Sequence, residues 1–116
     1  MNVPRHRQES FPQGDTWIIV GHLFGRDGNP LPLSGGIFLQ WALMDDARTV
    51  AAGATTNDSI SITDPEGGLI EIRLDPSITA GLGPGAYSDA LRANVAGMIA
   101  TMWTGPIIVE ASPFNR

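Results

Sequence analysis

Cysteine is absent from this chain of 116 residues. Its absence excludes disulfide bonds, thiolate metal sites and a cysteine nucleophile. Lysine is absent as well, so the cationic side chains are scattered arginines, which together number 7 against 12 acidic residues. The formal net charge is −5. Because a protein that binds nucleic acid presents a concentrated basic face, we expect no nucleic-acid partner.

Long hydrophobic runs are also missing. No stretch approaches the roughly 18 consecutive apolar residues that indicate a membrane-spanning helix. The start of the chain, MNVPRHRQES, lacks the apolar segment of a secretory signal. The sequence therefore predicts a soluble product of cytoplasmic synthesis with no membrane partner.

Glycine and proline are plentiful, at 14 and 9 residues, and 42% of the residues are hydrophobic. A chain of this length fits one domain, which buries roughly two thirds of the surface of its unfolded state. Only 16% of the residues are charged. The low charge and the apolar runs argue against disorder, and the many glycines and prolines indicate turns between short strands.

Short apolar or alternating runs predict about seven β-strands, separated by turn signals about every 8 to 12 residues. This pattern is typical of an antiparallel sandwich. Gly105–Pro106 predicts a bulge or bend in the last strand, and Asp75 followed by Pro76 predicts a capped helical turn. A helix is the alternative for residues 37–44, although their length and glycine-rich and acidic flanks favour a strand. The predicted strands are residues 16–24, 37–44, 49–55, 59–63, 69–74, 83–95 and 98–111.

The tryptophans Trp17, Trp41 and Trp103 each lie in one of these runs. We expect them to pack in the core, because a tryptophan buries a large area; an exposed platform for sugars is the alternative. In residues 16–24 the alternation places Trp17 and Gly21 on one face and His22 on the opposite face. We expect both faces to be largely covered. The connector GRDGNPLPLSG, residues 25–35, is interpreted as a crossing between strands with no reactive residue.

The segment from Met1 to Gln13 is polar, contains two prolines and has no periodicity. It is either a disordered tail or an arm that becomes ordered against a neighbouring subunit. For the arm we expect mobility in the free protein and partner contacts through Val3, Arg5, Arg7 and Phe11. The predicted organisation is an extended arm over residues 1–13, a sandwich over residues 14–113 and a short tail over residues 114–116.

Candidate chemistry is sparse. His6 and His22 are the two histidines, and neither has a nucleophile in a suitable context. Adjacent acids in the turns do not match the spacing of a glycosidase pair or a calcium loop. GLGPG lacks the lysine and the serine or threonine of a phosphate loop. We therefore expect no catalytic residue, no metal site and no cofactor.

The order of the motifs is more specific than any single motif. GDTW opens a strand, DGNPLPLSG leads to IFLQWALMD, ITDPEGGLIEIRL forms a hairpin, PSITAGLGPGAYSDAL introduces the last strands and TGPIIVE ends them. Across residues 14–113 this order resembles the immunoglobulin-like N-terminal domain of the baseplate upper protein family of tailed bacteriophages. Two departures are PLSG where the family has DLTG, and YSDAL where the family has an aromatic-rich YxYEL.

The resemblance implies an all-β, antiparallel immunoglobulin-like β-sandwich and a virion structural protein that is not an enzyme. It implies an accessory or adaptor of the tail, baseplate or neck, located in the virion, that forms a homo-oligomer and binds other virion proteins. A capsid decoration protein is the alternative within the same particle. A carbohydrate-binding module with an exposed tryptophan is the alternative from another class, and a glycosidase ranks last.

Overall fold

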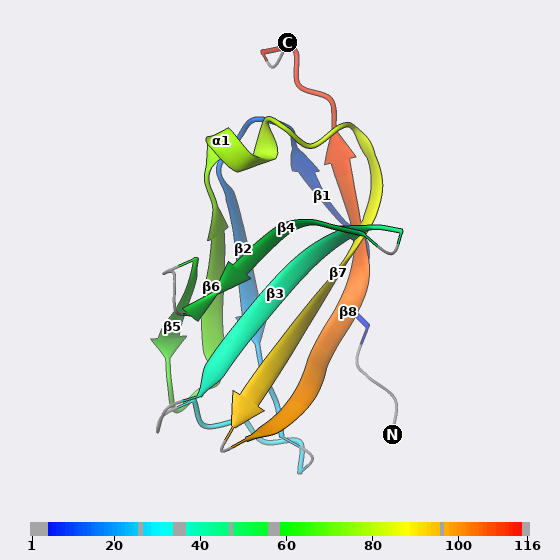
Figure 1. The fold of residues 1–116 in the computed structure, drawn as a ribbon. Helices are drawn as coiled ribbons and strands as arrows, with labels where there is room; N and C mark the ends of the chain where they lie inside the picture. The colour runs from blue at the N-terminus through cyan, green and yellow to red at the C-terminus, as the bar shows by residue number, and fades with distance from the viewer. Residues whose placement is uncertain are drawn as a thin grey trace.

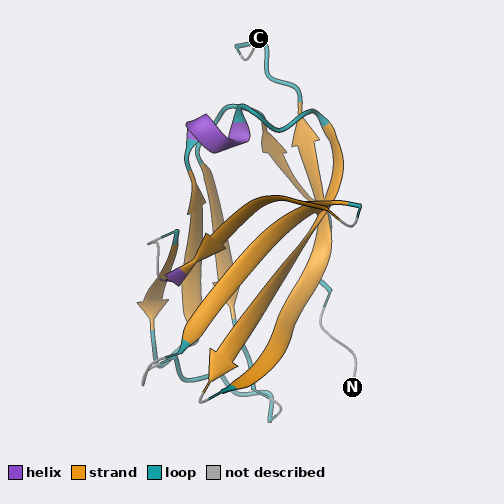
Figure 2. Cartoon of the chain, viewed as in Figure 1, coloured by secondary structure: helices purple, strands orange, loops and turns teal. Residues whose placement is uncertain are grey.

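The computed structural model describes residues 5–25, 27–33, 37–46, 48–55, 59–95 and 97–114. Two β-sheets pack face to face (Figures 1 and 2). The five-stranded sheet has the order β1-β8-β7-β3-β4, and the three-stranded sheet has the order β2-β6-β5. The strands of the first are β1 (Glu9–Pro12), β8 (Met98–Glu110), β7 (Gly85–Val95), β3 (Phe38–Asp45) and β4 (Arg48–Ala54). Those of the second are β2 (Trp17–His22), β6 (Leu69–Leu74) and β5 (Ile60–Asp64).

Neighbouring strands pair antiparallel throughout, except that β1 pairs parallel with β8. The two strand orders match those of an immunoglobulin variable-type domain, with β2, β3, β7 and β8 as strands B, C, F and G. The predicted immunoglobulin-like sandwich is therefore confirmed. The described residues form eight strands where the sequence predicted about seven, and the additional strand is β1.

A short helix, α1 (Pro76–Thr79), follows β6 where a helical turn was predicted. Asp75 lies at its N-cap position in an extended conformation, but its side chain makes no capping hydrogen bond. The capping role predicted for Asp75 is therefore wrong. The helix closes one end of the sandwich, where the Thr79 hydroxyl donates a hydrogen bond to the Asp15 carbonyl oxygen at 2.7 Å.

The core lies between the sheets and is built from the alternating apolar residues of both. Trp17 and Trp41 are each only 1% exposed, which confirms their predicted place in the core. The outer side of β2 differs from the expectation, because Ile18 and Val20 are 49% and 70% exposed. The prediction that both faces of this strand are covered is wrong, because each sheet of a two-layered sandwich has one face against the core and its other face open to solvent.

The connector between β2 and β3 crosses from the three-stranded to the five-stranded sheet, as predicted. Phe24 and Pro30 form an isolated bridge, and the Leu33 amide donates to the Pro65 carbonyl oxygen at 2.8 Å. Gly28 has a φ of 81°, a conformation that glycine adopts without strain. Gly35, at the end of this connector, lies outside the described residues.

The bulge predicted at Gly105–Pro106 is wrong, because β8 runs without interruption through both residues. The irregularity in the pairing of β7 with β8 falls instead between Leu91 and Arg92. Gly105 has a different role. A Cβ atom at this position would overlap the ring of His6, so the glycine lets the N-terminal segment approach β8 closely.

Candidate functional site

The N-terminal segment lies along β8 of its own domain. We call residues 5–12 the docked arm. Arg5 forms an isolated bridge with Thr104, the His6 amide donates to the Thr104 carbonyl oxygen at 2.9 Å, and β1 continues the parallel pairing. This arrangement differs from the expectation of an arm that is mobile in the free protein and orders against a neighbouring subunit. The domain boundaries at Gly14 and Pro113 stay predictions.

Asp89 on β7 is the centre of a buried polar cluster. Its side chain is 1% exposed, and its Oδ2 atom accepts hydrogen bonds from Trp41 Nε1 at 2.7 Å and Trp103 Nε1 at 3.0 Å. Its Oδ1 atom lies 2.5 Å from His6 Nε2 on the docked arm. We call these four residues the Asp89 cluster. A buried carboxylate is costly unless it is fully partnered, and both oxygens of Asp89 have donors.

Asp89 stands where immunoglobulin domains have the strand F cysteine of their disulfide. The hydroxyl of Tyr87 at the start of β7 donates to the Gly83 carbonyl oxygen at 2.7 Å, which is the tyrosine corner of immunoglobulin domains. In antibody domains the cysteine of strand F follows this tyrosine by two residues, and a strand C tryptophan packs against the disulfide. Asp89 and Trp41 hold these positions here, so hydrogen bonds stand where the cysteine-free sequence has no disulfide.

Trp103 extends the cluster to the opposite sheet. A Cβ atom at Gly21 on β2 would overlap the Trp103 ring, so the indole packs directly against the backbone of the three-stranded sheet. The missing side chain at Gly21 is therefore required by the size of the indole. Trp103 is partly buried, which is consistent with the predicted core role but leaves one edge at the surface groove described next.

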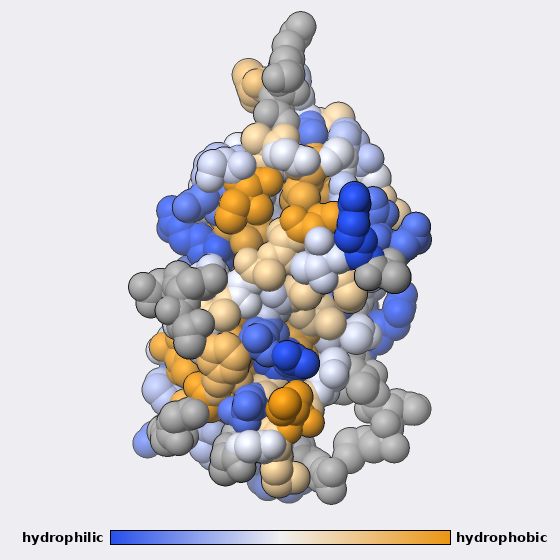
Figure 3. Space-filling view, viewed as in Figure 1, coloured by the Kyte–Doolittle hydropathy of each residue, from blue (hydrophilic) through white to orange (hydrophobic). Residues whose placement is uncertain are grey.

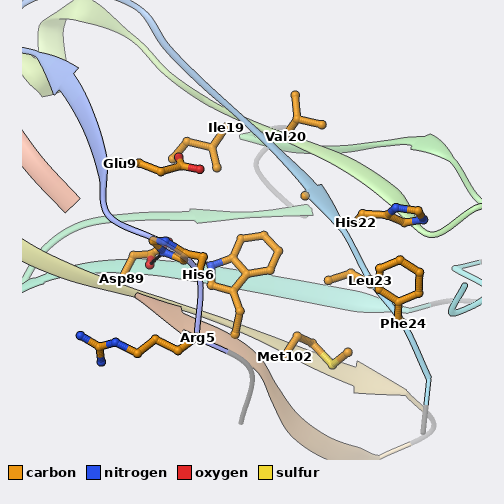
Figure 4. Close-up of a pocket in the computed structure, with 12 residues that line it drawn as sticks. Arg5, His6, Glu9, Ile19, Val20, His22, Leu23, Phe24, Asp89 and Met102 are labelled. Atoms are coloured by element: carbon orange, nitrogen blue, oxygen red, sulfur yellow. Dashed lines mark hydrogen bonds and ion pairs between the residues drawn. The ribbon is translucent and has the colours of Figure 1, made fainter. Parts of the chain in front are cut away.

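An apolar groove with a volume of about 290 Å³ lies between the docked arm and β2 (Figure 4). Arg5 and Glu9 contribute its charged side chains on the arm, while Val20 and Phe24 contribute apolar surface from the β2 side. His22 also lines the groove, and the centroid of its ring lies 4.2 Å from the ring centroid of Phe24. The arrangement offers an apolar contact surface with few polar groups, which is suited to binding.

His6 is held at both ring nitrogens. Its Nε2 atom faces Asp89, and its Nδ1 atom lies 2.6 Å from the carbonyl oxygen of Arg7. Burial by itself lowers the pKa of His6, but the hydrogen bonds to Arg7 and Asp89 and the charges of Asp89 and Glu9 outweigh burial. The pKa of His6 is therefore raised above its ordinary value of 6.5.

The predicted partner contacts fall in different surroundings. Arg5 and Arg7 are exposed on the docked arm. Phe11 is half-buried and stacks on Trp17, with ring centroids 5.0 Å apart, so in this structure it anchors the arm to its own domain. Val3 lies outside the described residues.

The Asp89 cluster is not predicted in the sequence analysis above. The alternation of residues 83–95 puts Asp89 on the same strand face as Tyr87 and Leu91, and an acid on an inward face requires buried donors. His6 lies in the arm, and its sequence context does not indicate Asp89 as a partner. The available signal was an aspartate at an inward position of a strand, preceded by tyrosine at a spacing of two residues.

The outer side of the five-stranded sheet forms a second candidate surface. A shallow hollow lies over β3, β4 and β7, and its exposed lining consists of small or neutral residues apart from Arg92, the only charged residue among the described residues that line it. Arg92 Nε donates to Gln40 Oε1 at 2.6 Å. The middle of this side is mostly pale orange in Figure 3, interrupted by blue. We call it the outer hollow; its lining includes Gln40, Ala42, Ala52, Ala54, Ala90, Arg92 and Thr101.

Among the described residues, no group of three or more histidines and acids is placed to hold a metal ion. No helix in the described part of the chain is long and apolar enough to cross a membrane.

One solved structure shares the fold over almost the whole chain, and a second aligns with it more weakly. The N-terminal domain of phage TP901-1 ORF48 aligns with a TM-score of 0.60 and 13% identity, covering 93% of this chain and 99% of that one. The NK cell receptor Nkp44 aligns with a TM-score of 0.41 and 10% identity, covering 97% of this chain and 100% of that one. The second similarity is too low to support an argument. No family model and no curated protein matches the sequence. The similarity to the phage domain confirms, at the level of fold, the resemblance indicated by the motif order.

Proposed function

We propose that this protein is a structural component of a tailed-bacteriophage virion, an accessory or adaptor of the tail, baseplate or neck that binds neighbouring virion proteins. The observation that carries the proposal is the shared fold with the N-terminal domain of phage TP901-1 ORF48, which covers 93% of this chain and 99% of that one. The order of motifs across residues 14–113 supports it independently, because it resembles a baseplate family.

The side chains support a role in binding without catalysis. Both oxygens of Asp89 are occupied by hydrogen bonds, and His6 is held between Asp89 and a backbone carbonyl. His22 is exposed beside Phe24. A general base needs a proton donor or an orienting partner within hydrogen-bond reach, and the groove presents none to His22 among the described residues.

The tryptophans weigh against the carbohydrate-binding alternative. A sugar platform needs an aromatic face open to solvent, whereas Trp17 and Trp41 are 1% exposed. Trp103 packs against Gly21 and donates its indole N–H to Asp89. These positions favour protein contacts over glycan recognition as the function.

Two surfaces are suited to partners in the particle. The outer hollow has small side chains and one charge, so a flat surface of another subunit can approach it without desolvating many ions. Arg5 and Arg7 are exposed cations on an acidic protein, and a second copy with net charge −5 offers carboxylates to them. We propose that a homo-oligomer uses these surfaces.

The test is to find the protein in the particle. Phage tails and heads are separated and each fraction is probed with an antibody against this chain. We expect the signal in the tail fraction. A signal confined to heads identifies a decoration protein instead, and absence from purified particles contradicts the proposal.

A pair of matched variants tests the outer hollow in the same assay. Ala52→Glu places a charge in the hollow on β4, and Ser61→Glu places one on the exposed side of β5 in the other sheet. We expect Ala52→Glu to reduce incorporation severalfold and Ser61→Glu to leave it unchanged. Equal incorporation of both variants excludes the outer hollow as the contact surface.

A further inference from the structure

The two histidines line the same groove but are held very differently. The side chain of His6 is 23% exposed, and both of its nitrogens face oxygen acceptors. His22 is exposed, and its ring packs against the ring of Phe24. His6 is therefore part of the contact between the arm and the rest of the domain. His22 lines the same groove and offers a matched control for substitutions at His6.

The hydrogen bonds of His6 require a proton between His6 and Asp89. A neutral imidazole has one donor and one acceptor nitrogen, and only imidazolium donates from both. The carbonyl oxygen of Arg7 can only accept, so Nδ1 must carry a proton. At 2.5 Å, the contact between Nε2 and Oδ1 of Asp89 needs a proton of its own. A neutral imidazole keeps one N–H, so deprotonation sets a ring lone pair against either the Asp89 carboxylate or the Arg7 carbonyl oxygen and weakens the contact.

The charges around His6 favour holding that proton. Asp89 faces it from β7 and Glu9 from β1, and both are acidic. Arg5 and Arg7 lie on the arm itself, with Arg7 in contact through its backbone carbonyl. β2 contributes His22 to the same groove, and β8 contributes no charge, since its residues beside His6 are Thr104 and Gly105.

We propose that His6 and Asp89 form a proton-dependent latch, which fastens the N-terminal arm to β8 and loosens it as the pH rises. The latch acts at one end of the arm, and Phe11 on Trp17 holds the other. Release of the His6 end exposes the buried carboxylate and opens part of the β8 edge. The latch thus sets how available that edge is to a strand from another chain.

The direction of the pH dependence follows from the raised pKa of His6. Because docking raises it above 6.5, docking takes up a proton. The contribution to arm docking is fully present below about pH 6.5 and is lost as the pH rises through the raised value of the docked state.

The test is hydrogen exchange of the backbone amides of residues 9–11 in the full chain, compared between His6→Gln and wild type at the same pH. Comparison at one pH cancels the intrinsic pH dependence of exchange. We expect His6→Gln to speed exchange by at least fivefold at pH 6 and by less than twofold at pH 9. His22→Gln is the matched control, and its ratio should stay near one at both values.

The Asp89→Asn background tests the partner. Asparagine keeps an oxygen that can accept from Trp41 and Trp103 but carries no charge. In this background we expect the effect of His6→Gln to be the same at both pH values. If Asp89→Asn leaves the pH dependence of the His6→Gln effect intact, Asp89 is not the partner and the latch is wrong.

A second measurement avoids substitutions altogether. In an NMR titration of wild type, the His6 imidazole should change protonation at a higher pH in the folded protein than in urea. A folded midpoint at or below the unfolded one overturns the latch, as does an equal effect of His6→Gln at pH 6 and pH 9. An equal effect of His6→Gln at the two pH values would mean that the contact between His6 and Asp89 is structural and does not depend on the proton.

Discussion

Trp41 stabilises the fold in two separable ways. Its ring is buried in the core at 1% exposure, and its indole N–H supplies one of the donors to the buried carboxylate of Asp89. The burial follows from the alternation of residues 37–44, whereas the hydrogen bond joins positions 48 residues apart in sequence. Substitutions that remove one or both contributions tell them apart.

We predict that Trp41→Ala lowers the free energy of unfolding by roughly 3 to 5 kcal/mol, as truncation of a core aromatic does. Trp41→Phe keeps most of the ring but deprives Asp89 of a donor, and should cost roughly 1 to 3 kcal/mol. Urea unfolding followed by circular dichroism measures both. A loss below 1 kcal/mol for Trp41→Ala would contradict the buried position.

At the scale of elements, the strands with clear alternation were predictable. β6 alternates between inward Ile70 and Ile72 and outward polar residues, and both isoleucines are fully buried. β1 was not predictable in this way, because ESFP has one sizeable apolar residue and a proline. It pairs because β8 offers a free edge, and that edge exists only after the hairpin with β7 has formed.

Docking of β1 changes the expectation for an arm deletion. From sequence, removal of residues 2–13 should leave the melting temperature of the isolated domain nearly unchanged. In the structure the deletion removes the Phe11 stack on Trp17 and the His6 hydrogen bond to Asp89. We now expect a loss of roughly 2 to 4 kcal/mol, from lost burial and an exposed carboxylate.

Thermal unfolding of the full and shortened chains measures that loss. Phe11→Ala, which removes the stack but leaves His6 in place, should fall between the two. An unchanged melting temperature after the deletion would mean that arm docking adds nothing to stability, and the sequence-based expectation would then stand.

The whole molecule has one core shared by both sheets. Trp17 on β2 and Trp41 on β3 belong to the same buried cluster, and Trp103 on β8 packs against Gly21 on β2. Neither sheet can keep its inward residues dry without the other. This arrangement favours cooperative unfolding of the two sheets together.

We predict that urea unfolding is two-state. Tryptophan fluorescence reports the core and far-ultraviolet circular dichroism reports the strands, and their transitions should coincide. The reducing agent dithiothreitol should leave the midpoint unchanged, since the chain has no cysteine. Separate midpoints for the two probes would show that part of the sandwich unfolds on its own.

The sequence by itself determined the class of this protein. The alternation of apolar residues, the turn signals and the absence of cysteine specify a disulfide-free β-sandwich, because side-chain period and turn chemistry are local properties. Tertiary structure alone decided the place of Asp89. Its donors are Trp41 on β3, Trp103 on β8 and His6 on the docked arm. His6 lies 83 residues away from Asp89 in the sequence. A buried carboxylate is stable only where folding converges such donors on it, and no local pattern encodes that convergence.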